Sequence, residues 1–174
     1  YKGGYNLDNK NAKSVFAPIN GKVISLDEVP DPVFSDRVLG EGCAIIPEDG
    51  KIYSPVNGKI SSIADTRHAY GIESDDGLEI LIHFGLETVS LKGQGFTSHV
   101  KVGDNVKVGD LIAEADIKLL KQHNINLITP VLICDGIENK IMTVNEGMVK
   151  AGKIAVLTVE DAEIEEPEQN SSSN

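Results

Sequence analysis

Gly77-Leu78-Glu79-Ile80-Leu81-Ile82-His83-Phe84-Gly85 is the stretch that decides how the fold is interpreted. Its apolar and β-branched residues follow a turn signal, Asp75-Asp76-Gly77, and this combination predicts a β-strand. Strand side chains alternate between two faces, so we expect a buried face and an outward face. The buried face would carry Ile80, Ile82 and Phe84, and the outward face Glu79, Leu81 and His83. The stretch therefore places a titratable histidine on a rigid, partly apolar surface.

A second histidine precedes the same turn, in Thr66-Arg67-His68-Ala69-Tyr70-Gly71-Ile72. The two stretches flank the turn, which predicts a β-hairpin. If Asp75-Asp76 is the loop, His83 lies opposite His68. If Asp76-Gly77 is the loop, His83 lies opposite Tyr70 and diagonally from His68. Both registers bring the two imidazoles within about 5 to 8 Å of each other. A three-residue loop with a bulge would break this argument.

The charge and the cysteines exclude several classes of function. The chain has 174 residues, 40% of them hydrophobic, and a net charge of −11. This charge argues against nucleic-acid binding, which needs clustered lysines and arginines on the phosphate backbone. Cys43 and Cys134 lie far apart in apolar runs, without metal-site spacing, which predicts reduced core cysteines of a cytosolic protein. No apolar run reaches the ~18 residues of a membrane span.

Composition divides the chain into three parts. Residues 1–14 are rich in Gly, Asn and Lys and predict a flexible linker or N-terminal extension. Residues 15–160 have the periodic apolar pattern of one folded domain. Residues 161–174 are acidic and then rich in Ser and Asn, which predicts a disordered tail.

Two internal echoes indicate an all-β fold. Residues 16–26 resemble residues 53–63, and both place Asn-Gly between short apolar runs; residues 106–111 resemble residues 149–154. Short strands, regular turns and internal pseudo-symmetry predict a sandwich or barrel. Helical patterns are limited to two short segments, each of which follows an Asp cap: a single turn within 31–37 and a short helix within 116–123.

A pair of histidines is compatible with several chemistries. Two imidazoles are too few for a catalytic zinc, which takes three protein ligands. Glu79 or Glu87 could complete the set, but the known zinc spacings are absent. No serine lies in a nucleophile elbow, and no Gly-rich loop follows a strand-to-helix pattern. The remaining option is that a histidine itself is the nucleophile. A neutral imidazole can accept a phosphoryl group on one nitrogen while an acceptor holds the other N–H.

Apolar residues around the histidines favour a docking surface. Val33, Phe34, Leu81 and Val89 occupy positions that the pattern leaves outward or in loops. A contiguous exposed apolar patch marks a partner site. On pattern alone, Phe34 and Val89 are equally compatible with the ordinary core. His99 and His123 have no such neighbours in the sequence, and we predict that they are surface residues.

From about Phe16 to Val159, the chain resembles the glucose-type enzyme IIA domain of the bacterial phosphoenolpyruvate-dependent sugar phosphotransferase system. The stretches that carry the resemblance are Ala17-Pro18 through Gly21, Pro30-Asp31-Pro32-Val33-Phe34 with Gly40-Glu41-Gly42, Thr66-Arg67-His68-Ala69, Leu81-Ile82-His83-Phe84-Gly85-Leu86-Glu87-Thr88-Val89, and Leu91-Lys92-Gly93-Gln94-Gly95-Phe96.

The resemblance implies a phosphotransferase that works as a phosphohistidine carrier. His83 would take a phosphoryl group from the small carrier HPr and pass it to a cysteine of enzyme IIB, in trans or on the same polypeptide. His68 would stabilise the phosphoryl group, Thr66 would orient His68, and the Gly85 carbonyl would hold the His83 tautomer. The implied fold is an all-β antiparallel β-sandwich of the barrel-sandwich (duplicated hybrid) type with one or two short helical turns.

The resemblance also implies partners. Val33, Phe34, Leu81 and Val89 would form an apolar docking ring with Glu87 at its rim. No cofactor is implied to be required, although His68 and His83 can share a zinc ion with a carboxylate from a partner protein. Sugar permeases and metabolic enzymes are the expected regulatory partners. The expected location is the cytoplasm, or the inner face of the membrane through a linked permease.

Three other readings compete with the phosphocarrier. The first is a regulatory module that is phosphorylated on His83 but passes the group to no IIB cysteine. The second is a biotinyl or lipoyl carrier domain, suggested by residues 106–110, but the chain has no Met-Lys-Met hairpin. The third is a zinc hydrolase, which tight stoichiometric zinc in the isolated chain would favour.

Overall fold

The computed structural model describes residues 12–162, and they form the predicted antiparallel β-sandwich with a few short helices. Residues 1–11 and 163–174, which contain most of the predicted linker and tail, lie outside the described residues. The strands are β1 (Lys13–Phe16), β2 (Gly21–Ser25), β3 (Glu41–Pro47), β4 (Lys51–Tyr53), β5 (Gly58–Ile63), β6 (Ala69–Ser74), β7 (Glu79–His83), β8 (Phe96–Ser98), β9 (Asn105–Val106), β10 (Leu111–Ala115), β11 (Thr129–Asp135), β12 (Lys140–Val144), β13 (Gly147–Val149) and β14 (Ala155–Asp161). The helical segments are η2 (Leu26–Glu28), α1 (Pro32–Ser35), η3 (Thr88–Leu91) and α2 (Ile117–Gln122).

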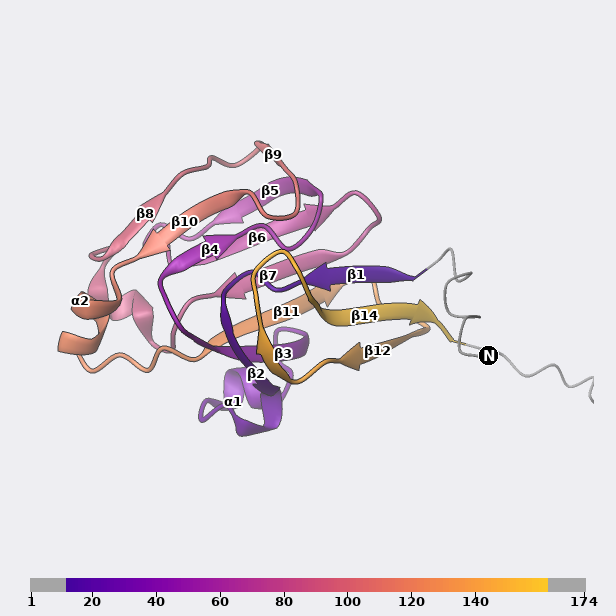
Figure 1. Cartoon of the computed structure of the whole chain (residues 1–174), viewed down its shortest axis with the longest axis horizontal. Coiled ribbons are helices and arrows are strands. Elements are labelled where there is room, and N and C mark those ends of the chain that lie inside the picture. The colour runs from indigo at the N-terminus through magenta and orange to yellow at the C-terminus, as the bar shows by residue number, and fades with distance from the viewer. Residues whose placement is uncertain (1–11, 163–174) are drawn as a thin grey trace, which may run out of the picture.

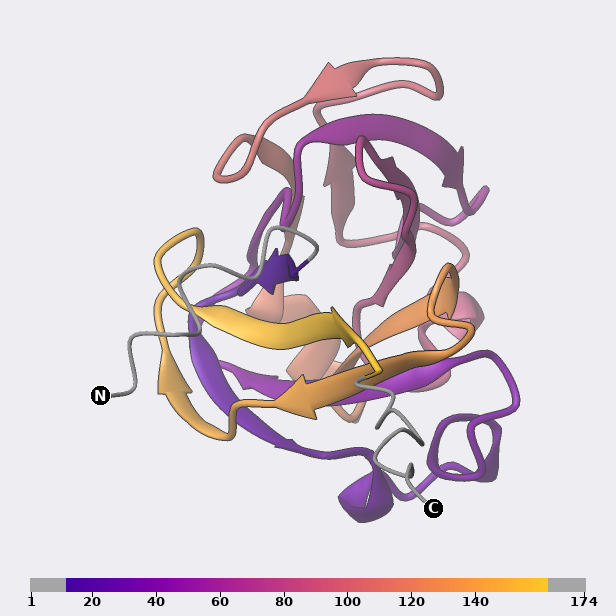
Figure 2. The ribbon, with the colours of Figure 1, turned by 90° about the vertical axis from the view of Figure 1, so that its right-hand side faces the viewer.

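Three antiparallel sheets enclose the main core (Figures 1 and 2). The largest has the strand order β13-β2-β3-β11-β7-β6-β5-β9, and the others are β1-β14-β12 and β4-β10-β8. Ile82 of the large sheet, Leu157 of β14 and Ile112 of β10 belong to one buried cluster, so the sheets pack their apolar faces together. Burial of this apolar surface is the main driving force for folding. Ile80, Ile82 and Phe84 all lie on the buried face, as the alternation predicts.

The first pair of sequence echoes forms a reciprocal contact. The Phe16 N–H donates to the Pro55 carbonyl at 2.9 Å, and the Tyr53 N–H donates to the Pro18 carbonyl at 2.8 Å. Each echo thus satisfies a backbone group of the other just before β2 and β5 begin. The internal similarity in sequence therefore corresponds to a local two-fold relation in the fold.

The second pair of echoes repeats this relation through asparagine side chains. Asn57 Oδ1 accepts the Val108 N–H at 2.9 Å, and Asn20 Oδ1 accepts the Ala151 N–H at 2.7 Å. Each asparagine comes from the Asn-Gly of one first-pair echo and reaches one second-pair echo. The repeated Asn-Gly therefore does more than turn the chain, because its amide also joins distant segments.

A smaller core lies on the other side of the large sheet, beneath the connection from β2 to β3. This connection contains η2 and α1, and Asp31 caps α1 as predicted, with its carboxylate accepting the Val33 N–H at 3.0 Å. Phe34 points into the small core and is only 4% exposed. Of the two alternatives that the sequence left open for Phe34, the structure has the core one, because α1 turns this ring onto the sheet. The predicted helix at 116–123 is α2, capped by Asp116.

The two cysteines lie in different environments. Cys43 is buried in β3, as predicted, whereas Cys134 at the end of β11 is exposed. Its neighbour Leu132 is covered by the small core on the same face of the strand. Cys134 lies beyond that cover, so an apolar run alone overestimated its burial.

Candidate functional site

The β6–β7 hairpin has a register that differs from both predicted ones. His83 pairs with Ala69, and a three-residue loop, Asp75-Asp76-Gly77, joins the strands. Gly77 closes this loop with a φ of 96°, a left-handed conformation that glycine adopts readily. The predictions of a two-residue loop were therefore wrong.

The two imidazoles nevertheless meet, with ring centroids 4.6 Å apart and planes at 82°. Strand pairing does not explain this contact, because His68 precedes β6 and belongs to the loop after β5. Arg67 has a left-handed φ of 60° and reverses the chain there. The Phe84 N–H then donates to the His68 carbonyl at 2.8 Å, which fixes the loop against the end of β7.

Thr66 lies beside the ring of His68. Its Oγ1 is 2.6 Å from His68 Nδ1, and His68 is only 6% exposed. A hydroxyl can donate to or accept from an imidazole nitrogen. When the hydroxyl of Thr66 donates, Nδ1 is the acceptor and the proton of a neutral His68 lies on Nε2. In that state His68 presents an N–H donor at the ring edge opposite Thr66.

The hydrogen bond of His83 defines its tautomer. Nδ1 of His83 lies 2.8 Å from the carbonyl oxygen of Gly85. A carbonyl can only accept, so Nδ1 carries the proton, and Nε2 of the neutral ring has a free lone pair. This is the arrangement that a histidine nucleophile needs.

Gly85 is the residue that allows this hydrogen bond. Its φ is +78°, and a Cβ added here would lie 3.1 Å from the carbonyl oxygen of Asn126 and 3.2 Å from Thr88 Oγ1. An L-residue would be strained in this conformation and crowded on that side. Glycine thus lets the chain reverse directly after β7 and return a carbonyl to the histidine two residues earlier.

Both histidines have a lowered pKa. Burial lowers the pKa of His68 to about 4, and repulsion from the adjacent His83 adds to this. Burial also lowers the pKa of His83, although the Gly85 carbonyl opposes the shift. The lowered pKa values of the two histidines favour neutral rings at pH 7. The pair is therefore ready to use one lone pair without first losing a proton.

A depression of about 230 Å³ lies beside His83. Among its lining residues, Val33 is 44% exposed and Val89 is 59% exposed. Phe34 is buried, with its ring centroid 5.1 Å from that of His83. Glu87 is an exposed residue on the same wall. Leu81 is half-buried two residues before His83 and is not part of the lining.

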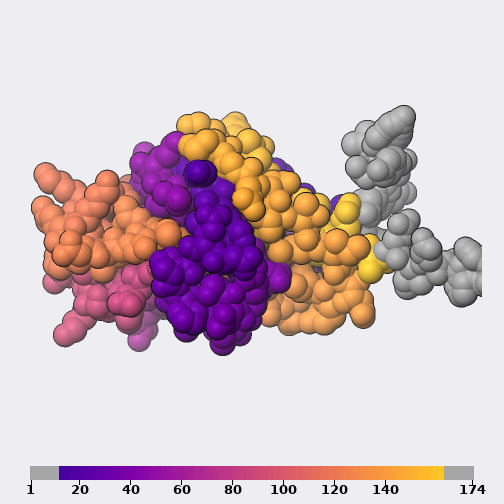
Figure 3. Space-filling model, turned by 90° about the horizontal axis from the view of Figure 1, so that it is seen from below, coloured from indigo at the N-terminus to yellow at the C-terminus, as the bar shows by residue number. Residues whose placement is uncertain are grey.

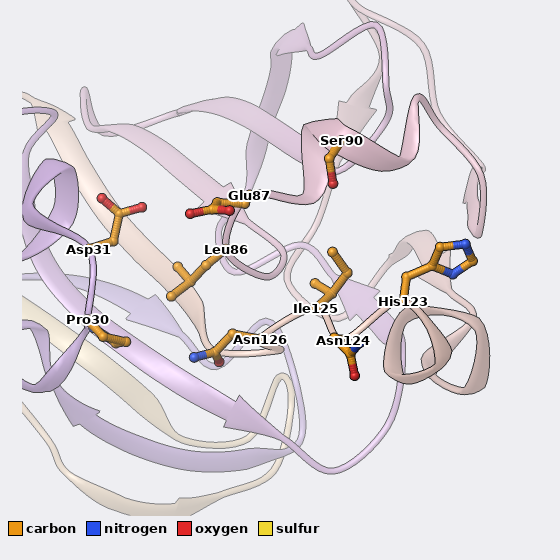
Figure 4. A pocket seen from close by; sticks show the side chains of 9 residues that line it. All are labelled: Pro30, Asp31, Leu86, Glu87, Ser90, His123, Asn124, Ile125 and Asn126. Carbon is orange, nitrogen blue, oxygen red and sulfur yellow. The ribbon is translucent and has the colours of Figure 1, made fainter.

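A second hollow, of about 330 Å³, continues from the first and shares two residues with it (Figure 4). Asp31 and Glu87 line both, and in the close-up their carboxylates face the same space from different segments. His123 lines the opposite end, at the right of the close-up, and Asn126 lies between, below Leu86. In Figure 3 the connection around α1 occupies the middle of this face, beside the segments that follow β7 and α2. The surface around His83 thus combines apolar side chains with the carboxylates of Asp31 and Glu87.

The remaining predictions concern the other two histidines and a possible metal site. His99 and His123 are on the surface, as expected; His99 Nε2 lies 2.8 Å from Glu114 Oε2. In residues 12–162 no group of three or more His, Cys, Asp or Glu side chains is arranged to hold a metal ion. His68 and His83 could supply two imidazole ligands, which is fewer than a zinc site requires.

The comparisons with known proteins identify the family of this chain. Residues 13–139 match the family model of the phosphoenolpyruvate-dependent sugar phosphotransferase system, EIIA 1. The chain belongs to this family. It is 46% identical to the glucose-specific EIIA component of Oceanobacillus iheyensis over 149 residues, which are 84% of this chain and 89% of that protein. It is 41% identical to the same component of Buchnera aphidicola from Acyrthosiphon pisum, covering 87% and 94%.

Two further matches are proteins of different size. The glucose permease IIA of Mycoplasma capricolum has the same fold, with a TM-score of 0.79, 38% identity, and 84% and 95% of the two chains covered. A glucoside-specific EIICBA component of Staphylococcus carnosus is 43% identical over 143 residues, which are only 21% of that longer protein. EIIA sequences thus occur both alone and within larger chains. In residues 12–162 no helix is long and apolar enough to cross a membrane.

Sequence reasoning missed several residues at the site. Leu39 and Asp31 line the depression, although Asp31 was noted only as a helix cap. No role was predicted for Thr88 or Thr129, yet both are fully buried beside Gly85. A buried threonine leaves no pattern of its own, because it fits the same apolar positions as valine. Only the backbone groups that it bonds reveal its role.

Proposed function

We propose that this EIIA chain carries a phosphoryl group on Nε2 of His83, taken from phosphohistidine of HPr and passed to a cysteine of an enzyme IIB domain. The observation that supports this most directly is the hydrogen bond of His83 Nδ1 to the Gly85 carbonyl, with His68 4.6 Å away between ring centroids. One nitrogen is held as a donor, and the other is left free as a nucleophile.

The first step is an in-line transfer between two imidazoles. The Nε2 lone pair of His83 forms a bond to phosphorus while the P–N bond of the donor breaks, and that electron pair returns to the donor ring. Positive charge develops on the His83 ring, whose Nδ1–H stays on the Gly85 carbonyl. Such transfers depend on positioning and charge stabilisation more than on covalent chemistry. The neutral state of both histidines removes the need for a proton transfer beforehand.

His68 acts on the oxygens of the group being transferred. With the Thr66 hydroxyl donating to Nδ1, the Nε2–H of His68 donates to a phosphoryl oxygen. Loss of this donor should slow transfer more than it prevents acceptance, since the nucleophile stays in place. Thr66 is then an orienting residue, because it selects the tautomer of His68.

Partner proteins dock on the surface around His83. Val33, Val89 and Phe34 supply the apolar ring, with Leu81 packed behind it, and Glu87 supplies charge at the rim. In the onward step a IIB thiolate attacks phosphorus, and the electron pair of the P–N bond returns to Nε2. The IIB domain acts in trans or on the same polypeptide.

We assign a cytoplasmic location and no required cofactor to this function. A zinc ion, where it binds, would be held by the two histidines together with a carboxylate from a partner, since two imidazoles alone leave the site incomplete. The EIIA domain of this proposal includes all the strands from β1 to β14, residues 13–161. Sugar permeases and metabolic enzymes are the proposed regulatory partners.

The test is intact-mass analysis after incubation with phosphoenolpyruvate, enzyme I and HPr. We expect an acid-labile gain of one phosphoryl group in the wild type and none in His83→Ala. His68→Ala should accept the group but transfer it slowly to a IIB domain. His99→Ala is the matched control, because His99 is a surface histidine away from the pair, and it should behave as wild type. An equal gain in His83→Ala, or no gain in the wild type with active HPr, would overturn the proposal.

A further inference from the structure

Two threonines hold the peptide unit between Phe84 and Gly85 from its two ends. The hydroxyl of Thr88 donates to the Phe84 carbonyl at 2.6 Å, and Oγ1 of Thr129 accepts the Gly85 N–H at 3.3 Å. Both threonines are completely buried. The carbonyl and the N–H of one peptide are thus each paired with a side chain that comes from a different segment.

The hydroxyl of Thr129 has a defined direction. It donates to the carbonyl of Leu127 at 2.9 Å, so a lone pair is left to face the Gly85 N–H. A buried hydroxyl with a donor on one side and an acceptor on the other has little freedom to rotate. Thr129 therefore provides a hydrogen-bond acceptor for the Gly85 N–H, in addition to filling space in the core.

The next peptide unit is also held at both ends. The Gly85 carbonyl accepts from His83 Nδ1 at 2.8 Å, and the Leu86 N–H donates to the Asn126 carbonyl at 2.8 Å. Only the φ and ψ of Gly85 lie between the two peptide planes, and glycine by itself restricts them little. The first plane must therefore be fixed by its own contacts if the Gly85 carbonyl is to point steadily at His83.

We propose that Thr88 and Thr129 are positioning residues that fix the tautomer of His83 by orienting the turn that carries the Gly85 carbonyl. Because both side chains are fully buried, we expect them to act on His83 through the turn. Their influence on transfer rests on the proposed function, whereas their influence on the tautomer belongs to the unphosphorylated protein. The two parts can therefore be tested separately.

The experiment compares Thr88→Val with Thr88→Ser. Valine keeps the shape of threonine but leaves the buried Phe84 carbonyl without its donor, and serine restores the hydroxyl. The ring nitrogens of His83 are observed by ¹⁵N NMR at neutral pH, and kcat/KM for transfer from phosphorylated HPr is measured on the same samples. We expect Thr88→Val to lose Nδ1–H population and about tenfold in kcat/KM, and Thr88→Ser to recover both. Thr143→Val is the control, since Thr143 is exposed on β12 in a different sheet, and it should match wild type.

A merely structural role predicts a different result. In that case Thr88→Val would have a lower urea midpoint with the wild-type tautomer and rate, and this outcome would overturn the proposal. If Thr88→Val does not fold, Thr129→Val decides, because it removes the acceptor of the Gly85 N–H, together with the donor to the Leu127 carbonyl, and leaves the bond from Thr88 to Phe84 in place. If the wild type accepts no phosphoryl group, the proposed function fails, but the NMR comparison still supports or refutes the positioning role.

Discussion

The two halves of the eight-stranded sheet have the same plan but different contents. Strands β13-β2-β3-β11 form one half, and β9-β5-β6-β7 form the other in mirrored order. Gly21 pairs with Pro47 in the first half, as Gly58 pairs with Ser74 in the second. The repeated sequences thus build repeated strands, and the halves meet where β11 pairs with β7.

His83, the proposed phosphoryl acceptor, has a counterpart of opposite character in the other half. His83 pairs with Ala69 of β6, and Leu132 pairs with Gly42 at the equivalent place in β3. His83 is half-exposed, whereas Leu132 is fully buried in the small core. The same backbone position therefore supports chemistry in one half and packing in the other.

The connections between strands explain this difference. The first half joins β2 to β3 through η2 and α1, which cover the sheet, and the second joins β5 to β6 by a short loop that ends at His68. The long connection buries Leu132, and its α1 also reaches the edge of the depression at His83. The repeated strands thus form the common framework of the two halves, and the difference in their connections leaves the surface at His83 uncovered.

The largest effect on stability should come from truncating one of these two equivalent residues to alanine. Leu132→Ala removes a fully buried side chain and should lower the free energy of unfolding by about 2–5 kcal/mol, measured by urea denaturation. His83→Ala should change that free energy far less while it abolishes phosphorylation. A cost below about 1 kcal/mol for Leu132→Ala would mean that the small core is not a stabilising element, and the comparison would fail.

The short connection should make stability depend on pH through His68. Its pKa is lowered to about 4 in the folded protein, while in an unfolded chain it would be near 6.5. As the pH falls from about 6.5 to about 4, the unfolded state binds a proton that the folded state does not, so the free energy of unfolding decreases. The full effect is about 3 kcal/mol. The loss of stability is complete at a pH below the pKa of His68 in the folded protein and absent at a pH above its pKa in the unfolded chain.

The check is urea denaturation at several pH values for the wild type and His68→Gln. Glutamine does not titrate, so the difference in unfolding free energy between the two proteins isolates the histidine. As the pH falls from about 6.5 to about 4, we expect the free energy of unfolding of the wild type to decrease relative to that of His68→Gln. Parallel curves would show that His68 titrates normally and that burial does not keep it neutral.

The sequence predicted the architecture and the pair of histidines, but not how the pair is assembled. Alternation placed Ile82 inward and His83 outward, because a strand with one buried face has little choice. The hairpin register depended on whether Gly77 closed a two- or a three-residue loop, and composition does not distinguish these. The rings meet because Arg67, which has a left-handed backbone conformation, reverses the chain before His68. No pattern in the sequence predicts this conformation.

The docking residues show a similar limit. Short apolar segments next to a helix cap do not reveal which side chain faces the sheet, so Phe34 and Val33 looked alike in the sequence. In the structure Phe34 is 4% exposed and Val33 is 44% exposed. A charge at Phe34 would therefore be buried and would unfold the small core before it could report on docking. A test of docking needs a residue that is exposed in the free protein.

The smallest effect concerns Val89, which is 59% exposed at the depression beside His83. Val89→Asp places a charge where a partner is expected to bury apolar surface, and desolvating that charge costs free energy. We expect kcat/KM for transfer from HPr to fall about tenfold with an unchanged urea midpoint. Val102→Asp is the matched control, because Val102 is 60% exposed and lies in the turn before β9, in the same half of the sheet but not in the lining of the depression. Equal rates for the two variants would show that partners approach His83 from elsewhere. A loss in Val89→Asp alone would show that the rim built by η3 and α1 is the docking surface, and that the unequal connections serve recognition as well as chemistry.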